Sequence, residues 1–283
     1  MKTLAILKKD MEFNSNLFSL IEALKNIAVA QFKILERKIR SFDRLMLTVE
    51  SFFALIDTTR LVHPFFNPQG RPQAVVAVTS DSGLLGGLNI QVVNRALYEL
   101  TQIPGKLIVI GDRGKMYAKE NGVPFVAFSG IKDEERYSQA MQVRDYMLNK
   151  ILDGTYGHLK VVYPRPVSFT VQCIEVASFL PFVPKGSKAD SAPRLLPDMI
   201  LESNPNYIAE YLLYLWIGHK FYEIFGLSRL AELAARFVHL EDSSQKLKDM
   251  EKKIKLEYFR VRHEIIDRNM RELFATRLMY AYK

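Results

Sequence analysis

A glycine-rich turn after a β-branched run is the feature of this chain most suggestive of ligand chemistry. The run covers residues 74–78, and the turn contains Gly83, Gly86 and Gly87. A strand, a glycine-rich turn and a helix in this order can hold dinucleotide phosphates on backbone N–H groups. However, the spacing here is G-x-x-G-G rather than G-x-G-x-x-G, and only Asp112 could supply the acidic residue that follows. We therefore interpret the glycines as residues that permit a tight turn between strand and helix.

Other residues with catalytic potential are few and scattered. No G-x-x-x-x-G-K-[ST] phosphate loop occurs, and the five histidines lack the spacing of metal ligands. Cys173 is the only cysteine, which excludes an intramolecular disulfide or a cysteine-based zinc site and favours a reducing compartment. We expect it to be a buried structural residue. The sequence thus predicts no catalytic residue, no cofactor and no metal.

The composition is that of a folded soluble protein. Hydrophobic residues make up 48% and charged residues 25% of the 283 residues, with a net charge of +8. The basic residues are interleaved with acidic ones, as in residues 246–255, and no RNA-binding signature occurs, so we expect no nucleic-acid partner. The longest apolar run, residues 211–217, is too short to span a bilayer.

Two long hydrophobic heptad seams lie at opposite ends of the chain. The first is broken only by Gln31 and Lys38, and its apolar members are Leu17, Ile21, Leu24, Ala28, Leu35, Phe42, Leu45, Val49, Phe52 and Ile56. The second consists of Leu230, Leu233, Phe237, Leu240, Ser244, Leu247, Glu251, Ile254, Tyr258, Val261, Ile265, Arg268, Glu272, Ala275 and Met279. Alternating steps of three and four residues are typical of a left-handed coiled coil. Because each seam needs a partner, we expect the two ends to form an antiparallel coiled coil.

Between the seams, strand and helix patterns alternate. Strands are expected at residues 74–78, 106–110, 124–128, 159–163 and 169–179, and helices at residues 89–100, 113–121 and 137–152. This order predicts a mostly parallel, Rossmann-like α/β domain.

The chain is thus predicted to have three parts. They are an N-terminal coiled-coil helix in residues 1–60, the α/β domain in residues 72–200, and a C-terminal coiled-coil helix in residues 205–283. The first helix should run from Leu4 or Asn14 to Asp57, with a possible break near Asn14-Ser15-Asn16. Residues 181–197 should form a loop, because they contain several prolines.

Several motifs resemble the gamma subunit of F-type ATP synthases. Residues 79–89, TSDSGLLGGLN, resemble the family signature T-S-D-R-G-L-C-G-G-x-N, and residues 108–114 with Tyr117 resemble the next strand of the family. Residues 23–28 resemble A-M-K-M-V-A. The C-terminal helix follows the family pattern without a gap, with matches at Glu232, Ala235, Arg236, Tyr258, Arg262, Ile266 and Glu272. The resemblance covers nearly the whole chain.

The chain also departs from the family pattern. The departures are Leu24 for methionine, Ser82 for arginine, Leu85 for cysteine, Phe259 for asparagine, His263 for glutamine and Asp267 for threonine. In the family, an Arg-Gln pair hydrogen-bonds a loop of a catalytic subunit. Arg262 keeps the forked cation of that pair, whereas His263 has a different geometry. The resemblance therefore implies a divergent gamma subunit.

The resemblance implies a non-catalytic rotor shaft, the central stalk that couples proton- or sodium-driven rotation to ATP synthesis or hydrolysis. Its implied partners are a ring of three alpha and three beta nucleotide-binding subunits, an epsilon-type subunit and the membrane ring of c subunits. The implied contacts with catalytic-subunit loops are Arg262, His263, Arg236 and Lys25. Leu278 and Met279 would form an apolar bearing, because nonpolar contact is non-directional.

Three other interpretations compete with a conventional synthase shaft. One is the shaft of a specialised F1-like ATPase without a conventional membrane sector, another is a coiled-coil scaffold, and a third is a nucleotide-binding enzyme built on the α/β domain. The N-terminal residues lack a signal-peptide core, and the absence of an obvious transit peptide favours a bacterial origin over an organellar one. We therefore expect a position on the cytoplasmic side of a bacterial plasma membrane, with the matrix side of the mitochondrial inner membrane as the alternative.

Overall fold

The computed structural model describes residues 3–39, 48–49, 52, 63–68, 70–183 and 203–281. The chain divides into two compact units, which we describe separately: residues 29–236, and residues 1–28 together with 237–283. Most of the predicted helix beyond Ile39, with the seam positions Phe42, Leu45 and Ile56, lies outside the described residues. The same holds for most of the loop predicted at residues 181–197.

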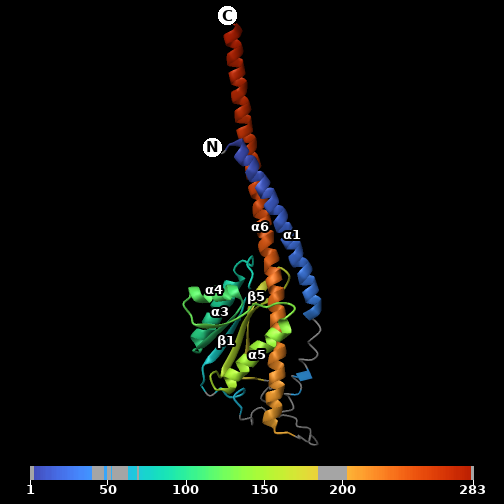
Figure 1. The fold of residues 1–283 in the computed structure, drawn as a ribbon, viewed down its shortest axis with the longest axis vertical. Coiled ribbons are helices and arrows are strands. Elements are labelled where there is room, and N and C mark those ends of the chain that lie inside the picture. The colour runs from blue at the N-terminus through green and yellow to red at the C-terminus, as the bar shows by residue number, and fades with distance from the viewer. Residues whose placement is uncertain are drawn as a thin grey trace. The chain divides into compact units, whose positions relative to one another are not determined.

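The larger unit is built on a five-stranded sheet of order β3-β2-β1-β4-β5 (Figure 1). Its strands are β1 (Gln73–Val78), β2 (Gly105–Ile110), β3 (Phe125–Phe128), β4 (His158–Pro166) and β5 (Gln172–Leu180). The first four strands of the sheet pair in parallel, and β5 pairs antiparallel with β4. This arrangement confirms the predicted α/β fold, and each expected strand is present within a few residues of its predicted bounds.

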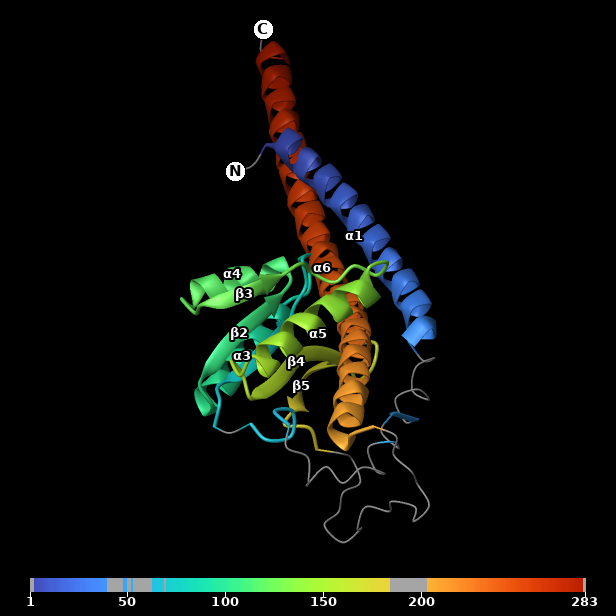
Figure 2. The ribbon, with the colours of Figure 1, turned by 60° about the horizontal axis from the view of Figure 1, so that its bottom comes forward.

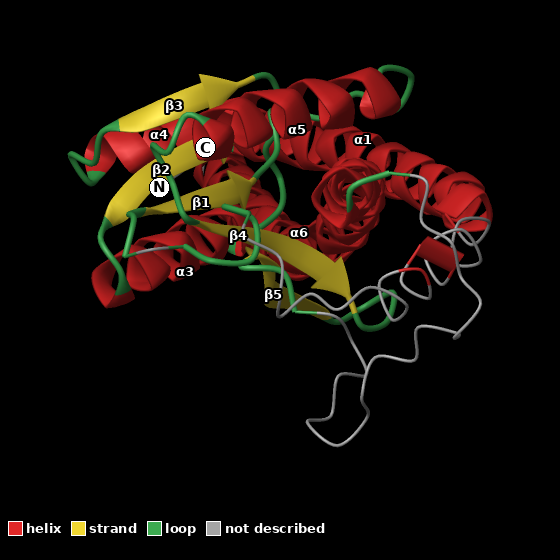
Figure 3. Ribbon diagram, turned by 90° about the horizontal axis from the view of Figure 1, so that it is seen from below, coloured by secondary structure: helices red, strands yellow, loops and turns green. Residues whose placement is uncertain are grey.

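Helices cover both faces of this sheet (Figure 3). They are α3 (Leu88–Gln102), α4 (Asp112–Glu120), α5 (Arg136–Leu152) and the part of α6 (Pro205–Ala281) that belongs to this unit. Alternate residues of a strand point to opposite faces. Accordingly, Val75 packs in one apolar cluster with Val92 of α3, while Val76 packs in the other with Met147 of α5 and Phe221 of α6. The β-branched runs are therefore buried on both sides, as parallel sheets require.

The glycine-rich turn connects β1 to α3 by a network of its own polar groups. The Ser80 backbone N–H donates to Asn89 Oδ1 at 3.2 Å, and Asn89 Nδ2 donates to Ser80 Oγ at 2.9 Å. Gly86 has a φ of +58°, a left-handed value that favours glycine. Because these groups satisfy one another, the turn has the structural role that its spacing predicts.

The smaller unit pairs α1 (Leu4–Ile39), up to Ala28, with α6 from Phe237 onward (Figure 2). The side-chain amide of Asn14 donates to the Leu247 carbonyl at 3.1 Å, and Lys25 Nζ lies 2.8 Å from Glu241 Oε2. The later residue of α1 thus contacts the earlier residue of α6, so the two helices are antiparallel. Helix α1 runs through Asn14 without a break.

The predicted C-terminal seam matches the burial of α6 over most of its length. Every seam position from Leu230 to Ile265 is buried or half-buried, but the seam positions Arg268, Glu272 and Ala275 are exposed. Beyond Ile265 the seam prediction was therefore wrong, because no described residue of α1 covers that stretch. No helix among the described residues has the length and apolarity to cross a membrane.

Cys173 differs from its prediction. It lies on β5, which pairs only with β4 among the described strands, and its side chain is half-buried rather than fully buried.

Candidate partner-binding surfaces

Lys25 is held in a polar layer between the two helices of the coiled coil. Its ammonium group lies 2.7 Å from Glu22 Oε1 and 2.8 Å from Glu241 Oε2, and Ser244 Oγ donates to Glu22 Oε1 at 2.9 Å. The hydrogen bonds to Glu22 and Glu241 raise the pKa of Lys25. The hydrogen bonds that Glu22 accepts from Lys25 and Ser244 lower the pKa of Glu22. The charge of Lys25 is therefore already paired with carboxylates of the same chain.

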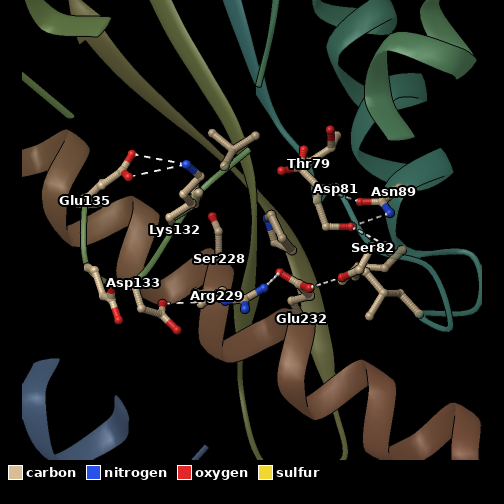
Figure 4. Close-up of a pocket in the computed structure, with 17 residues that line it drawn as sticks. Thr79, Asp81, Ser82, Asn89, Lys132, Asp133, Glu135, Ser228, Arg229 and Glu232 are labelled. Carbon is tan, nitrogen blue, oxygen red and sulfur yellow. Dashed lines mark hydrogen bonds and ion pairs between the residues drawn. The ribbon is translucent and has the colours of Figure 1, made fainter. Parts of the chain in front are cut away.

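Arg236 also has its charge paired within the chain. Its guanidinium lies 2.6 Å from Glu232 Oε1 and also donates to Ser82 Oγ, and Ser82 Oγ lies 2.8 Å from Glu232. Arg229 binds the other oxygen of Glu232 at 2.6 Å and faces Asp133 at 3.5 Å (Figure 4). These groups link α6 to the turn after β1.

Arg262 and His263 are both exposed on α6. Among the described residues, neither makes a hydrogen bond or an ion pair. Phe259 and Ile266, one turn away on each side, are exposed as well. Two unpaired basic side chains beside apolar ones can bind an acidic loop with an apolar flank.

Helix α6 continues for about three turns beyond the stretch that α1 buries. Every side chain from Ile266 to Arg277 is exposed, including Met270, Leu273 and Phe274, of which Phe274 is 61% exposed. Leu278 and Met279 lie within α6, but their side chains lie outside the described residues. Large apolar side chains on an uncovered helix indicate a surface that another polypeptide buries.

Sequence reasoning missed the role of Arg229 and Asp133. They are 96 residues apart in the chain, and neither belongs to a motif. The only sequence signal was the i, i+3 spacing of Arg229 and Glu232 on a helix. In the part of the chain that the structure describes, no group of three or more His, Cys, Asp or Glu side chains could hold a metal ion.

The fold combines an α/β unit with a coiled-coil unit, and comparison with known proteins identifies the family. The sequence model of the ATP synthase family matches residues 3–276, so the chain belongs to this family. Within it, the chain is a divergent gamma subunit, the rotor shaft of the central stalk.

Bacterial gamma chains are similar over much or all of their length. The ATP synthase gamma chain of Bdellovibrio bacteriovorus is 26% identical over 288 residues, covering 97% of this chain and 98% of that one. The gamma chain of Symbiobacterium thermophilum is 28% identical over 217 residues, covering 75% of this chain and 74% of that one.

Solved rotors share the fold. A rotor chain of the Euglena gracilis mitochondrial ATP synthase aligns with a TM-score of 0.68 at 16% identity, over 93% of this chain and 98% of that one. A chain of the Tetrahymena thermophila mitochondrial central stalk and c-ring aligns with a TM-score of 0.60 at 14% identity, over 80% of this chain and 99% of that one.

Proposed function

We propose that this gamma subunit turns inside a ring of three alpha and three beta subunits, with an epsilon-type subunit and a ring of c subunits as its other rotor partners. The observation that carries the proposal is the uncovered stretch of α6 from Ile266 to Arg277. Its apolar side chains, Ile266, Met270, Leu273 and Phe274, have no cover among the described residues. An isolated helix of this length is marginal in water, so a surrounding partner would stabilise it.

On α6 just before this stretch, Arg262 and His263 are the proposed contacts with catalytic-subunit loops. Both are exposed, and neither has a described partner within the chain. An arginine can bind a carboxylate through two parallel N–H···O bonds. Lys25 and Arg236 are secondary proposals, because a partner would compete with Glu241 for the first and with Glu232 for the second. Leu278 and Met279 remain proposed as the apolar bearing.

The coupling mechanism follows from the asymmetry of such a shaft. A pair of different helices presents a different face to each of three otherwise identical sites. Each face makes different contacts, and differential contact free energy is what shifts a site between conformations. Rotation driven by protons or sodium ions exchanges these faces, which links ion flow to ATP synthesis or hydrolysis.

The gamma subunit itself is proposed to be non-catalytic, with nucleotide chemistry confined to the surrounding ring. The proposed location is the cytoplasmic side of a bacterial plasma membrane, with the matrix side of a mitochondrial inner membrane as the alternative. The bacterial gamma chains among the relatives support the first.

Affinity purification from the native source, followed by mass spectrometry and an ATPase assay, tests this function. We expect the tagged chain to recover alpha and beta subunits at three of each per copy. Arg262→Ala should reduce the ATPase activity of the recovered complex several-fold. Lys253→Ala is a control, because Lys253 is exposed on the same helix but lies about 180° around it from Arg262 and more than two turns before His263.

The other outcomes separate the competing interpretations. Recovery of the alpha and beta ring with other proteins in place of c subunits would indicate a specialised ATPase without a conventional membrane sector. Recovery of the chain only, or as a homodimer, would overturn the rotor proposal and favour a scaffold.

A further inference from the structure

The first turns of α6 present a stripe of tyrosines to solvent. Between Asn206 and Lys220, a stretch that the structure describes in full, the only exposed residues are Tyr207, Tyr211 and Tyr214. They follow one another at steps of four and three residues, so they lie within about 60° of one another around the helix. The solvent face of a helix usually carries charged side chains. A face of tyrosines is instead typical of a surface that binds another polypeptide.

Farther along α6, the same tyrosine stripe is covered by arginines of α5. Tyr222 continues the stripe, because it lies about 20° around the helix from Tyr211. The Arg144 Cζ lies 3.6 Å from the centre of the Tyr214 ring, and the Arg136 Cζ lies 4.3 Å from the centre of the Tyr222 ring. Each guanidinium also donates to the hydroxyl group of its tyrosine, and both arginines are buried. Stacking of arginine on tyrosine is therefore how this stripe is packed inside the chain.

The arginines of α5 do not reach the exposed end of the stripe. Helix α5 crosses α6 at an angle, and its C-terminal end lies away from α6 (Figure 2). Two turns beyond Arg144, α5 ends at Leu152. The side chains of Tyr207 and Tyr211 are 70% and 64% exposed. Among the described residues, their phenol groups have no hydrogen-bond, aromatic or cation–π partner.

A carboxylate beside the exposed tyrosines favours a cation at this surface. Glu210 lies three residues after Tyr207 and four before Tyr214, and residues at these spacings are neighbours on the helix surface. Among the described residues, the only ion-pair partner of Glu210 is His63, whose Nε2 lies 3.5 Å away. Burial lowers the pKa of His63, so its ring is neutral at pH 7. The charge of Glu210 is thus left without a positive charge opposite it, and a tyrosine face also attracts cations.

We propose that Tyr207 and Tyr211 bind an arginine-bearing segment of another polypeptide. Its guanidinium groups would stack on the two exposed rings, as already occurs on Tyr214, and one of them would pair with Glu210. Arginine fits better than lysine because its planar guanidinium is weakly hydrated and stacks on aromatic faces. This surface belongs to the larger unit, so its partner is separate from the acidic loops proposed to bind at Arg262.

Fluorescence anisotropy on the full chain tests this surface. The probe is a labelled, capped alanine-based peptide with two arginines four residues apart, a spacing that matches Tyr207 and Tyr211 on a helix. The control peptide carries citrulline at both positions, because citrulline has nearly the same shape without the charge. We expect the arginine peptide to bind at least about fivefold more tightly than the citrulline peptide, as two exposed cation–π contacts predict.

Substitutions of the tyrosines separate ring stacking from apolar contact. Tyr207→Leu and Tyr211→Leu should each weaken binding of the arginine peptide about two- to fivefold, because leucine is apolar but has no aromatic ring. Tyr211→Phe keeps the ring and should bind within about twofold of the wild type. Glu210→Gln should weaken binding without changing either ring. Tyr98→Leu is the matched control, because Tyr98 is 54% exposed on α3 and already lies under Arg95.

Equal binding of the arginine and citrulline peptides, or unchanged binding in Tyr207→Leu and Tyr211→Leu, would overturn the proposal. So would tighter binding of a proline-rich peptide of the same length, which would indicate a polyproline ligand for the aromatic surface. Absence of binding to the wild-type chain would overturn it as well. Because the experiment uses the chain without other subunits, none of these results depends on whether it assembles with an ATPase ring.

Discussion

Lys25 and Glu241 are 216 residues apart in the chain, yet their charged groups lie 2.8 Å apart between α1 and α6. The pair lies beside Ser244, a polar position within the second heptad seam. Charged groups at such positions fix which residues face each other, because a shift in register would leave them without partners. This ion pair therefore sets the register of the antiparallel coiled coil.

The first prediction concerns that ion pair. In a double-mutant cycle of Lys25→Met and Glu241→Gln, we expect a coupling free energy of about 0.2–1 kcal/mol, the usual value for a solvent-accessible pair. Thermal unfolding of the wild type, the two single variants and the double variant, monitored by circular dichroism, measures this coupling free energy. The paired but more exposed Lys252 and Asp249 provide the control cycle, which should give a smaller coupling. Equal coupling in the two cycles would contradict a special role for Lys25.

The second prediction concerns Asn14, which extends the first seam by one step before Leu17, is 3% exposed and donates to the Leu247 carbonyl. A buried amide in a heptad seam specifies register at a cost in stability. We expect Asn14→Leu to raise the free energy of unfolding by about 1–2 kcal/mol, measured by urea denaturation. Asn14→Ala should lower it, because it removes the hydrogen bond without restoring apolar contact. Destabilisation by Asn14→Leu would mean that the hydrogen bond outweighs apolar burial.

The sequence predicted most of the fold because periodicity reports burial directly. Residues 74–78 and 107–110 are apolar at every position, and the structure buries them on both sides of a parallel sheet. The heptad seam was correct from Leu230 to Ile265 for the same reason. It was wrong beyond Ile265, because a periodic pattern on one helix does not reveal where the partner helix begins.

The polar contacts of Ser82 could not be predicted, because its partners lie far away in the chain. Ser82 and Glu232 are 150 residues apart, and their contact depends on how α6 packs beside the turn after β1. The sequence did identify Ser82 as a departure from the family signature. Only the structure reveals that the hydroxyl of Ser82 lies between Glu232 and Arg236.

The third prediction concerns Gly114, in the second motif shared with the family. A Cβ at this position would lie 2.7 Å from Val109 Cγ1 and closer still to Thr79 Oγ1, which accepts the Gly114 backbone N–H. We expect Gly114→Ala to lower the free energy of unfolding by about 1–3 kcal/mol through overpacking. Gly87→Ala is the control, since the nearest atom there is Gln91 Nε2 at 3.6 Å, and it should change stability by less than about 0.5 kcal/mol. Similar losses from both variants would contradict the steric explanation.

The fourth prediction is a loss of stability in mild acid. Burial lowers the pKa of His63, despite Glu210 at 3.5 Å, and burial together with Arg144 lowers the pKa of His219. A histidine whose folded-state pKa lies below the unfolded value of about 6.5 binds more protons when the chain is unfolded. The free energy of unfolding should therefore fall as the pH drops from about 7 through 6.5 towards the folded-state pKa values.

Urea denaturation at a series of pH values measures this fall. His63→Gln combined with His219→Gln should flatten the profile between about pH 7 and pH 5.5, whatever the variant does to the overall stability. The profile from about pH 7.5 to 8.5 serves as the internal control, because both histidines are neutral there in the folded and the unfolded chain. A wild-type profile that rises on acidification, or one that keeps its slope in the double variant, would show that these two side chains do not determine the acid sensitivity.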